Sequence, residues 1–345
     1  MTALIPFIVI LIKIGVVIGG VLTVVAFMTW VERRGSALIQ DRLGPNRVGP
    51  FGLLQPVADG LKFLFKEEII PLEADKIIYH MAPLMIFTPA LAIFAVIPFS
   101  TPFEIFGLKI EPLISDLNFG ILYIIALSGI SVYGIVLAGF SSGSKYPLIG
   151  ALRSSAQLIS YEIPMSLSIL SVLIASDTFS LKGIISAQSS VNYGFIPNWF
   201  VFSQFIGFFV FLIAMFAETN RIPFDLPEAE AELVAGYHTE YSSMKFALFF
   251  LGEYAHMISA SALITVLYFG GHTIPFVNLS GFGGAILGFI SFSLKTGFFL
   301  WLFVWVRWTL PRFRYDQLMA LGWKFLFPLS ILNFVITIFF KWVNL

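Results

Sequence analysis

The sequence predicts an all-α, polytopic membrane protein with about eight transmembrane helices and an interfacial amphipathic helix in the first loop. Hydrophobic residues make up 58% of its 345 residues and charged residues only 12%, about half of what soluble proteins carry. The mean hydropathy is +0.91, and the apolar residues gather into long uncharged tracts. No soluble segment, fixed-period repeat or low-complexity block interrupts them. We therefore expect residues 1–345 to form a single integral membrane domain.

Eight segments are long and apolar enough to cross a bilayer as helices, because a hydrocarbon core of about 30 Å needs about 20 residues. The first segment is too long for a cleaved signal peptide. Glu32, Arg33 and Arg34 follow it, where a cleavage site would need small residues. The predicted spans cover 4–30, 80–100, 117–140, 156–176, 198–217, 246–269, 284–306 and 324–342.

Between the first two spans, residues 52–68 predict a helix that lies along the membrane surface instead of crossing it. Apolar residues recur there at helical spacing, while charged residues share the other side. Such a helix either caps the bundle or borders the access path of an amphiphilic, lipid-like substrate. The apolar side carries Leu54, Val57, Leu61 and Leu64, and the charged side carries Asp59, Lys62 and Lys66.

Basic residues fall almost entirely on one side of the predicted membrane. The loops between spans 1 and 2, 3 and 4, 5 and 6, and 7 and 8 hold fifteen of the twenty Lys and Arg, whereas the opposite loops hold only Lys109 and Lys182. By the positive-inside rule, the first set faces the cytoplasm. We therefore expect both termini outside, in the periplasm if the membrane is the bacterial inner membrane that we favour.

Acidic residues share the inside face. Fourteen of the twenty Asp and Glu lie in or beside the inside loops, although orientation alone does not require them. Charges of both signs on one face indicate a wet surface, a docking platform for a soluble partner, or both.

The composition also excludes several chemistries. The chain has no cysteine, which excludes disulfides, thiolate metal sites, iron–sulfur ligation and cysteine nucleophiles within it. Its net charge of zero does not fit a nucleic-acid binder, which needs a basic excess. The four histidines lack ligand spacing, and no catalytic triad or phosphate-binding loop occurs. We expect no metal site, no catalytic residue and no nucleic-acid partner.

The densest polar feature is the loop between spans 5 and 6. Pro227 suits the first turn of a helix, and the helix dipole favours acids there, so an ordinary helix start is one interpretation. Many carboxylates at a membrane boundary also repel one another, which lets some of them take up and release protons. Arg221 is their expected counter-ion. The carboxylates are Glu218, Asp225, Glu228, Glu230, Glu232 and Glu240.

Three charged residues lie inside predicted spans: Glu162 in span 4, Glu253 in span 6 and Lys295 in span 7. Each costs about 2.5–3.5 kcal/mol to insert, and such residues commonly mark ion or proton paths. A buried ion pair is the structural alternative. Because the carboxylates continue from the acidic loop into the membrane, we interpret them as a proton relay.

Long motifs from the first span to the last resemble those of one family. These motifs are VERR at 31–34, RLGPNRVGP at 42–50, GLLQPVADG at 52–60, LIGALR at 148–153, ISYE at 159–162, AETNRIPFDLPEAEAEL at 217–233 and LPRFRYDQLM at 310–319. On them the chain resembles the H-subunit family of proton-pumping NADH–quinone oxidoreductase (respiratory complex I). That family is homologous to the first mitochondrially encoded subunit and to the A-type subunit of the chloroplast NDH complex.

The resemblance implies an eight-helix subunit that joins the membrane arm of the complex to its peripheral arm. With two soluble subunits, such a protein encloses the quinone cavity and couples quinone reduction to proton translocation. Quinone, as substrate, is the only small molecule expected here, with no covalently bound cofactor. NADH, FMN and iron–sulfur clusters would belong to partner subunits. The implied partners are the other membrane-arm subunits, the soluble quinone-site subunits and membrane lipid.

Position by position, the resemblance implies two sets of site residues. The quinone-cavity set is Glu32, Arg33 and Asp59 near the quinone entrance, with Arg221, Asp225, Glu228, Glu230 and Glu232 in the acidic loop. The proton-relay set is Glu162, Glu218, Glu253 and Lys295. Arg307 matches a basic position on the approach between spans 7 and 8, without a defined role.

Two other functions stay open on the sequence. A stand-alone proton antiporter would often show paired broken helices in inverted repeats, and we find no two matching halves. The membrane anchor of a related hydrogenase or ferredoxin-linked complex is nearer, because the glutamate-rich loop alone does not separate it from the quinone enzyme.

Overall fold

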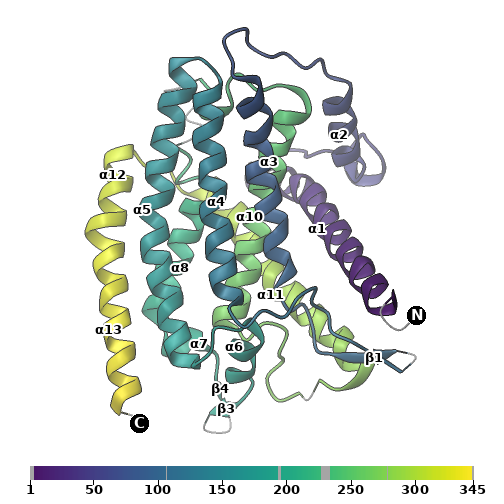
Figure 1. Cartoon of the computed structure of the whole chain (residues 1–345), viewed down its shortest axis with the longest axis vertical. Helices are drawn as coiled ribbons and strands as arrows, with labels where there is room; N and C mark the ends of the chain where they lie inside the picture. Colours follow the sequence, from purple (N-terminus) through teal and green to yellow (C-terminus); the bar gives the residue numbers. More distant parts are fainter. Residues whose placement is uncertain (1–3, 106, 193–195, 227–233, 278, 344–345) are drawn as a thin grey trace.

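The computed structural model describes residues 4–105, 107–192, 196–226, 234–277 and 279–343. Long helices run across the molecule, with shorter elements gathered at the two ends of the bundle (Figure 1). The long helices are α1 (Leu4–Ile39), α3 (Lys76–Ala92), α4 (Gly120–Ser141), α5 (Lys145–Ser176), α8 (Phe205–Glu218), α10 (Ser243–Tyr268), α11 (Gly281–Thr309) and α13 (Phe327–Val343). The shorter helices are α2 (Gln55–Phe65), α6 (Leu181–Ala187), α7 (Phe200–Ser203), α12 (Tyr315–Ala320) and the single turns Pro50–Gly52, Ile93–Ala95 and Gly236–His238.

The predicted polytopic architecture is confirmed. In the described residues, seven helices are long and apolar enough to span a membrane, and α8 is a shorter apolar helix. The span predicted at 198–217 corresponds to α7 and α8 together. The last span joins α12 to α13 through a π-helical turn at Leu321–Leu326.

Two helices extend well beyond their predicted spans. Helix α1 continues to Ile39, through Glu32, Arg33 and Arg34, and α5 begins at Lys145 instead of 156. Hydropathy marks only the part of a helix that suits hydrocarbon, whereas backbone hydrogen bonding continues wherever neighbouring helices support it. The polar extension of α1 carries Glu32 and Arg33, two predicted site residues that the hydropathy pattern placed in a loop.

Span 5 is broken at Gln204, a feature that the sequence did not predict. Gln204 has φ −116° and ψ 42°, outside the helical region, and separates α7 from α8. Its Oε1 accepts hydrogen bonds from Asn333 Nδ2 at 3.1 Å and Thr337 Oγ1 at 3.0 Å, both on α13. Broken helices persist at membrane depth only where their backbone polar atoms find partners. Here the Gln204 N–H donates to the Phe200 carbonyl at 2.7 Å and its carbonyl accepts from the Phe208 N–H at 2.8 Å, while α13 pairs the Gln204 side chain.

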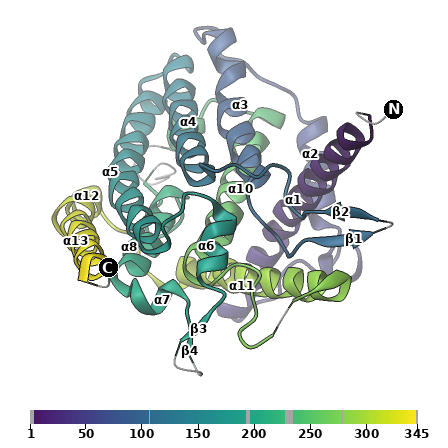
Figure 2. The same cartoon turned by 60° about the horizontal axis from the view of Figure 1, so that its bottom comes forward.

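Helix α10 is the centre of the bundle, and α1 and α13 are its flanks (Figures 1 and 2). In the most apolar 18-residue window, 72% of α10 is buried, against 11% of α1 and 22% of the α12–α13 span. Ile264, Val266 and Leu267 on α10 are fully buried. The flanks therefore leave many of their apolar side chains exposed on the outside of the bundle.

The amphipathic segment of the first loop forms a helix, α2, as predicted. It lies beside the bundle and is tied to α1 by Arg33 Nη1 and Asp59 Oδ2, which are 2.6 Å apart. Its apolar residues Val57 and Leu64 are exposed. This exposure suits a helix that rests on a lipid surface, so its interfacial position stays a prediction that the exposed face supports.

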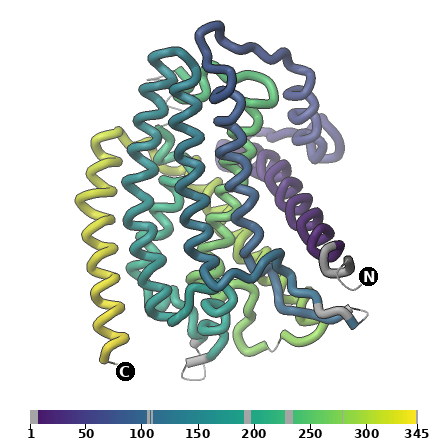
Figure 3. The backbone as a smooth tube through the Cα atoms, in the orientation of Figure 1, coloured from purple at the N-terminus to yellow at the C-terminus, as the bar shows by residue number. Residues whose placement is uncertain are grey.

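The two ends of the bundle differ. The loop end carries residues 40–75, 142–144, 219–226, 234–242 and 310–314. The hairpin end carries α6 and two short antiparallel pairs, β1 (Phe103–Ile105) with β2 (Leu108–Ile110) and β3 (Val191–Asn192) with β4 (Ile196–Pro197). Helix α1 begins and α13 ends toward the hairpin end (Figure 3). This placement suits two termini on one side of the membrane, and which side that is stays a prediction.

Candidate functional site

A network of buried charged side chains lies within the bundle, toward the loop end. It brings together residues that are far apart in the sequence. Glu32 comes from α1, Arg221 from the turn after α8, Glu253 and Tyr254 from α10, and Arg307 from the last turn of α11.

Glu32 is the acceptor at the centre of this network. Its Oε1 lies 3.4 Å from Arg221 Nη1 and also contacts Arg307 Nη1. Its Oε2 accepts a hydrogen bond from the Tyr254 hydroxyl. The Glu32 and Arg221 side chains are only 9% and 8% exposed. Two cations around one buried carboxylate offset the desolvation that would otherwise make its charge costly.

Arg221 extends the network toward Glu253. Its Nη2 lies 4.0 Å from Glu253 Oε2, and Glu253 Oε1 accepts a hydrogen bond from the Tyr237 hydroxyl at 3.1 Å. Glu32 was predicted at the quinone cavity and Glu253 in the relay. Arg221 contacts both, so the structure joins the two predicted sets.

Gln157 on α5 holds the turn that presents Arg221. Its Nε2 donates to the carbonyl oxygens of Ala217 and Phe224, each at 2.8 Å. Gln157 is fully buried, and these bonds pair carbonyls at and beyond the end of α8, where intrahelical donors run out. The position of the Arg221 guanidinium therefore depends on α5 as well as on its own turn.

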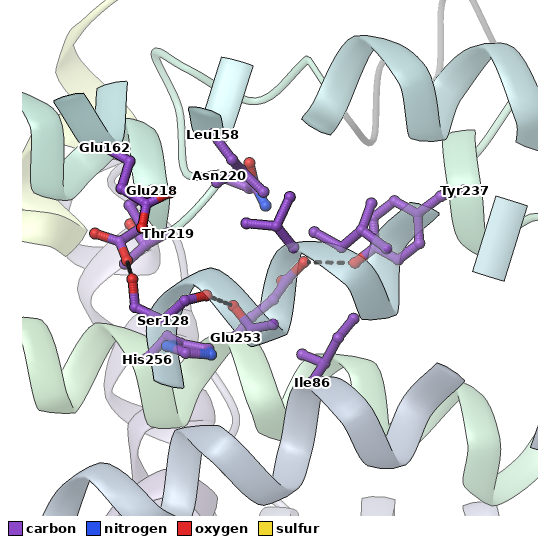
Figure 4. Close-up of a pocket in the computed structure, with 13 residues that line it drawn as sticks. Ile86, Ser128, Leu158, Glu162, Glu218, Thr219, Asn220, Tyr237, Glu253 and His256 are labelled. Atoms are coloured by element: carbon purple, nitrogen blue, oxygen red, sulfur yellow. Dashed lines mark hydrogen bonds between the residues drawn. The ribbon is translucent and has the colours of Figure 1, made fainter. Parts of the chain in front are cut away.

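A small cavity lies next to this network and contains three carboxylates that were predicted as a relay, Glu162, Glu218 and Glu253 (Figure 4). Ser128 Oγ donates to Glu218 Oε1 at 2.6 Å. The cavity measures about 30 Å³, which exceeds the 10–15 Å³ or so that a buried water needs. Other polar lining residues are Ser131, Thr219, Asn220, Tyr237 and His256.

A second cavity of about 30 Å³ lies on the other side of Glu218. It shares Ser128, Glu218, Thr219 and His256 with the first cavity. Most of its other lining is apolar, including Phe211, Met215 and Leu263, which reach toward the hairpin end. The first cavity, which is polar, thus lies next to the charged network. The second cavity, which is mostly apolar, lies on the far side of Glu218 from it.

The other predicted site residues lie apart from this network. Arg33 and Asp59 pair with each other between α1 and α2. Asp225 Oδ2 lies 3.6 Å from Arg312 Nη2. Glu228, Glu230 and Glu232 fall outside the described residues.

Lys295 is not brought to the carboxylates. Its Nζ donates to the carbonyl oxygens of Phe269, Gly271 and Thr273 at 2.8, 3.0 and 2.7 Å, just beyond the end of α10. Phe269 lies sixteen residues after Glu253, about 24 Å along a helix. A cation that binds carbonyls at a helix C-terminus is favoured by the helix dipole.

Sequence reasoning missed several polar residues of the site. Ser128, Tyr237, Tyr254 and His256 were not among the predicted residues, and Arg307 had no assigned role. Tyr254 follows Glu253 directly. His256 lies three residues after Glu253, a spacing that places the Glu253 and His256 side chains on one helix face. That spacing was the available signal. Ser128 and Tyr237 come from other elements, and no spacing pattern in the sequence pointed to them.

A buried histidine, His238, lies near the site in the short turn Gly236–His238. Its ring packs against Phe246 at 5.3 Å and Phe250 at 5.7 Å, measured between ring centroids. Burial among these rings lowers the pKa of His238 to about 4, because an apolar environment disfavours the charged imidazolium. His238 is therefore neutral at physiological pH.

Within the described residues, no group of three or more His, Asp or Glu side chains could hold a metal ion. The fold and the site define a polytopic membrane protein with ionisable residues connected through its interior. Such residues commonly serve ion or proton paths.

Comparison with known proteins identifies the family. The NADH dehydrogenase family matches residues 12–338, so the chain belongs to that family, as its motifs predicted. It is a membrane component of NADH–quinone oxidoreductase, as its similarity to that enzyme's H subunit over more than nine-tenths of its length shows.

Three relatives illustrate this similarity. The H subunit of NADH-quinone oxidoreductase from Rickettsia prowazekii is 52% identical over 331 residues, with 96% of this chain and 93% of the relative covered. The H subunit of the enzyme from Thermomicrobium roseum is 50% identical, with 93% of each chain covered. An H subunit from Cytophaga hutchinsonii is 48% identical, with 92% of each covered.

Proposed function

We propose that this chain forms part of the quinone cavity of a bacterial NADH–quinone oxidoreductase and that it couples quinone reduction to proton translocation. The observation that supports this proposal most directly is the position of Arg221, which contacts Glu32 on one side and Glu253 on the other. This contact connects the residues predicted near quinone with those predicted to relay protons. The proposed location is the bacterial inner membrane, with both termini in the periplasm.

Quinone enters from the bilayer beside α1 and α2 in this proposal. The exposed apolar side of α2 and the Arg33–Asp59 pair border that path. The cavity itself is formed with soluble subunits at the loop end, and its residues are Glu32, Arg33, Asp59, Arg221, Asp225, Glu228, Glu230 and Glu232. FMN and the iron–sulfur clusters belong to partner subunits, and this chain holds no covalently bound cofactor.

Reduction of the quinone to quinol consumes two electrons, which a partner's cluster supplies, and two protons. The resulting change of charge acts on the carboxylates of the acidic loop and on Arg221. A shift of the Arg221 guanidinium alters its attraction to Glu32 and to Glu253 together. Such attractions are strong in a low-dielectric interior, so the occupancy of the proton on Glu253 responds to the state of the cavity.

The response then passes from Glu253 to Glu218 and Glu162, which line the same cavity. Water in this cavity would connect the carboxylates. From there the coupling reaches the distant pump subunits of the membrane arm. Lys295 was predicted as a further relay residue and stays a prediction, since its contacts lie toward the hairpin end.

The bundle surface supports the expected partners. Loop-end charges suit the soluble quinone-site subunits, and the exposed apolar flanks α1 and α13 suit other membrane-arm subunits and lipid. Each class of partner therefore has a surface of matching chemistry on this chain.

The test uses Glu218→Gln and Glu228→Gln in the assembled enzyme, reconstituted in vesicles. Both variants keep the side-chain size and remove the ionisable carboxylate. We expect proton translocation per quinone reduced to fall by about tenfold or more in Glu218→Gln, since a positioned proton-transfer group contributes at least that much. Full quinone reduction with full pumping in both variants would overturn the relay.

A further inference from the structure

His256 occupies the boundary between the two cavities. It lies on α10, three residues after Glu253 and on the same face of that helix. Together with Ser128, Glu218 and Thr219, it lines both cavities. In the view of Figure 4, His256 and Ser128 lie between the Glu218 and Glu253 ends of the first cavity.

The ring of His256 has an unfilled hydrogen-bonding capacity. Its Nε2 is buried and has no hydrogen-bond partner among the described residues. Buried polar atoms in proteins are nearly always hydrogen-bonded, either to protein or to ordered water. Each adjoining cavity, at about 30 Å³, has room for water, and the polar lining of the first supplies several partners for it.

The two carboxylates are anchored at opposite ends of the first cavity. Ser128 holds the Glu218 carboxylate at 2.6 Å, and Tyr237 holds that of Glu253 at 3.1 Å. His256 borders the cavity that both carboxylates line. A water can carry a proton between them only when its hydrogen bonds are aligned with both carboxylates.

We propose that His256 is a positioning residue that holds the water connecting Glu253 to Glu218. The neutral imidazole has one N–H donor and one acceptor nitrogen, so it can orient that water without taking its proton. In the transfer, Glu253 gives a proton to the water, the water gives another to Glu218, and the imidazole is unchanged. This inference rests on the proposed relay through Glu218.

The structural alternative is that His256 only fills space between α10 and α4. The two roles predict opposite effects for two substitutions. Leucine keeps an apolar filling of similar volume and removes both nitrogens. Asparagine is smaller and packs less well, yet it retains a donor and an acceptor.

The experiment compares His256→Leu and His256→Asn in the assembled enzyme in vesicles, with quinone reduction and proton uptake recorded together. We expect His256→Leu to lower proton translocation per quinone reduced by about tenfold or more, since a misplacement of about 1 Å in a reaction path can cost about a hundredfold. His256→Asn should keep translocation close to the wild-type level, because it retains a donor and an acceptor. Wild-type pumping in His256→Leu, or an equal loss in both variants, would overturn the proposal.

Two controls distinguish a failure of this proposal from a failure of assembly and from a failure of the relay. His256→Met provides a second apolar side chain if His256→Leu does not assemble, with the same expected loss. Glu218→Gln is measured in parallel. Normal pumping in both Glu218→Gln and Glu228→Gln would show that the relay itself fails, whereas a loss in Glu218→Gln with wild-type pumping in His256→Leu removes only the role of His256.

Discussion

The guanidinium of Arg221 lies over the ring of Tyr254, 4.4 Å from its centroid, while the hydroxyl of the same tyrosine donates to Glu32. One side chain therefore contacts both members of the Arg221–Glu32 pair, the cation through its ring face and the carboxylate through its hydroxyl. A cation over an aromatic face is stabilised further when it is desolvated. Tyr254 thus aligns the pair that connects the two halves of the site.

The first prediction separates the two contacts of Tyr254. Tyr254→Phe removes only the hydroxyl, and we expect coupled quinone reduction to fall about tenfold, since hydrogen bonds to charged groups contribute about 1.5–3 kcal/mol. Tyr254→Leu removes the ring as well and should lower the rate of coupled quinone reduction further. Steady-state turnover of the assembled enzyme measures both. Equal rates for Tyr254→Phe and the wild type would show that the hydroxyl has no role.

A second prediction concerns Lys295, whose ammonium binds three carbonyl oxygens beyond α10. Lys295→Met leaves these carbonyls without that donor, so we expect a loss of stability of about 2–3 kcal/mol and less assembled complex. Lys295→Arg keeps the charge and is the matched control. Native gel electrophoresis measures assembly, and vesicle assays measure pumping. Normal assembly of Lys295→Met with lost pumping would instead support the relay role.

A third prediction tests the start of α3. The Asp75 carboxylate caps this helix and accepts from the backbone N–H groups of Ile77 at 3.1 Å and Ile78 at 3.3 Å. Asp75→Ala should destabilise the fold by about 1 kcal/mol, whereas Asp75→Asn should keep most of the cap. Thermal inactivation of the purified complex provides the comparison. A larger loss in Asp75→Asn than in Asp75→Ala would contradict the capping role.

The fourth prediction is a pH dependence from His238. Its pKa is about 4 in the folded protein and about 6.5 in an unfolded chain. Between these values the unfolded state binds more protons, so stability falls as the pH drops below about 6.5. The loss at about pH 5 is about 2 kcal/mol by this linkage. His238→Phe does not titrate, so its thermal midpoint should fall less than that of the wild type between about pH 7 and pH 5. An equal fall in both proteins would exclude His238 as the cause.

Apolar periodicity and length were enough to predict the spans, because hydrocarbon demands long uncharged helices whatever their neighbours are. They could not predict the break at Gln204, since its polar partners Asn333 and Thr337 lie on the last helix. The extension of α5 back to Lys145 was missed for a similar reason. Packing against neighbouring helices, and not hydropathy, decides where such a helix begins.

The site was predicted in part. Glu162 and Glu253 could be predicted as candidate site residues because they are carboxylates within apolar spans, and a charge in the membrane is costly wherever it occurs. The same reasoning grouped Lys295 with them, although its partners are carbonyl oxygens at the far end of α10. Charge and depth identify an unusual residue, but only the packing of helices decides what it faces. The contact between Arg221 and Glu253 needed that packing.

The shortness of α8 has a consequence for the depth of the site. With fourteen residues it is about 21 Å long, less than the roughly 30 Å of a bilayer core, and it begins toward the hairpin end. Helix α5, with 32 residues, is about 48 Å long and passes alongside it. Glu218, the last residue of α8, therefore lies well short of the loop-end start of α5: Gln157, which bonds the Ala217 carbonyl, is already twelve residues, about 18 Å, along α5. In the proposed relay, protons would therefore reach Glu218 from the loop end, past the polar side chains that line its cavity.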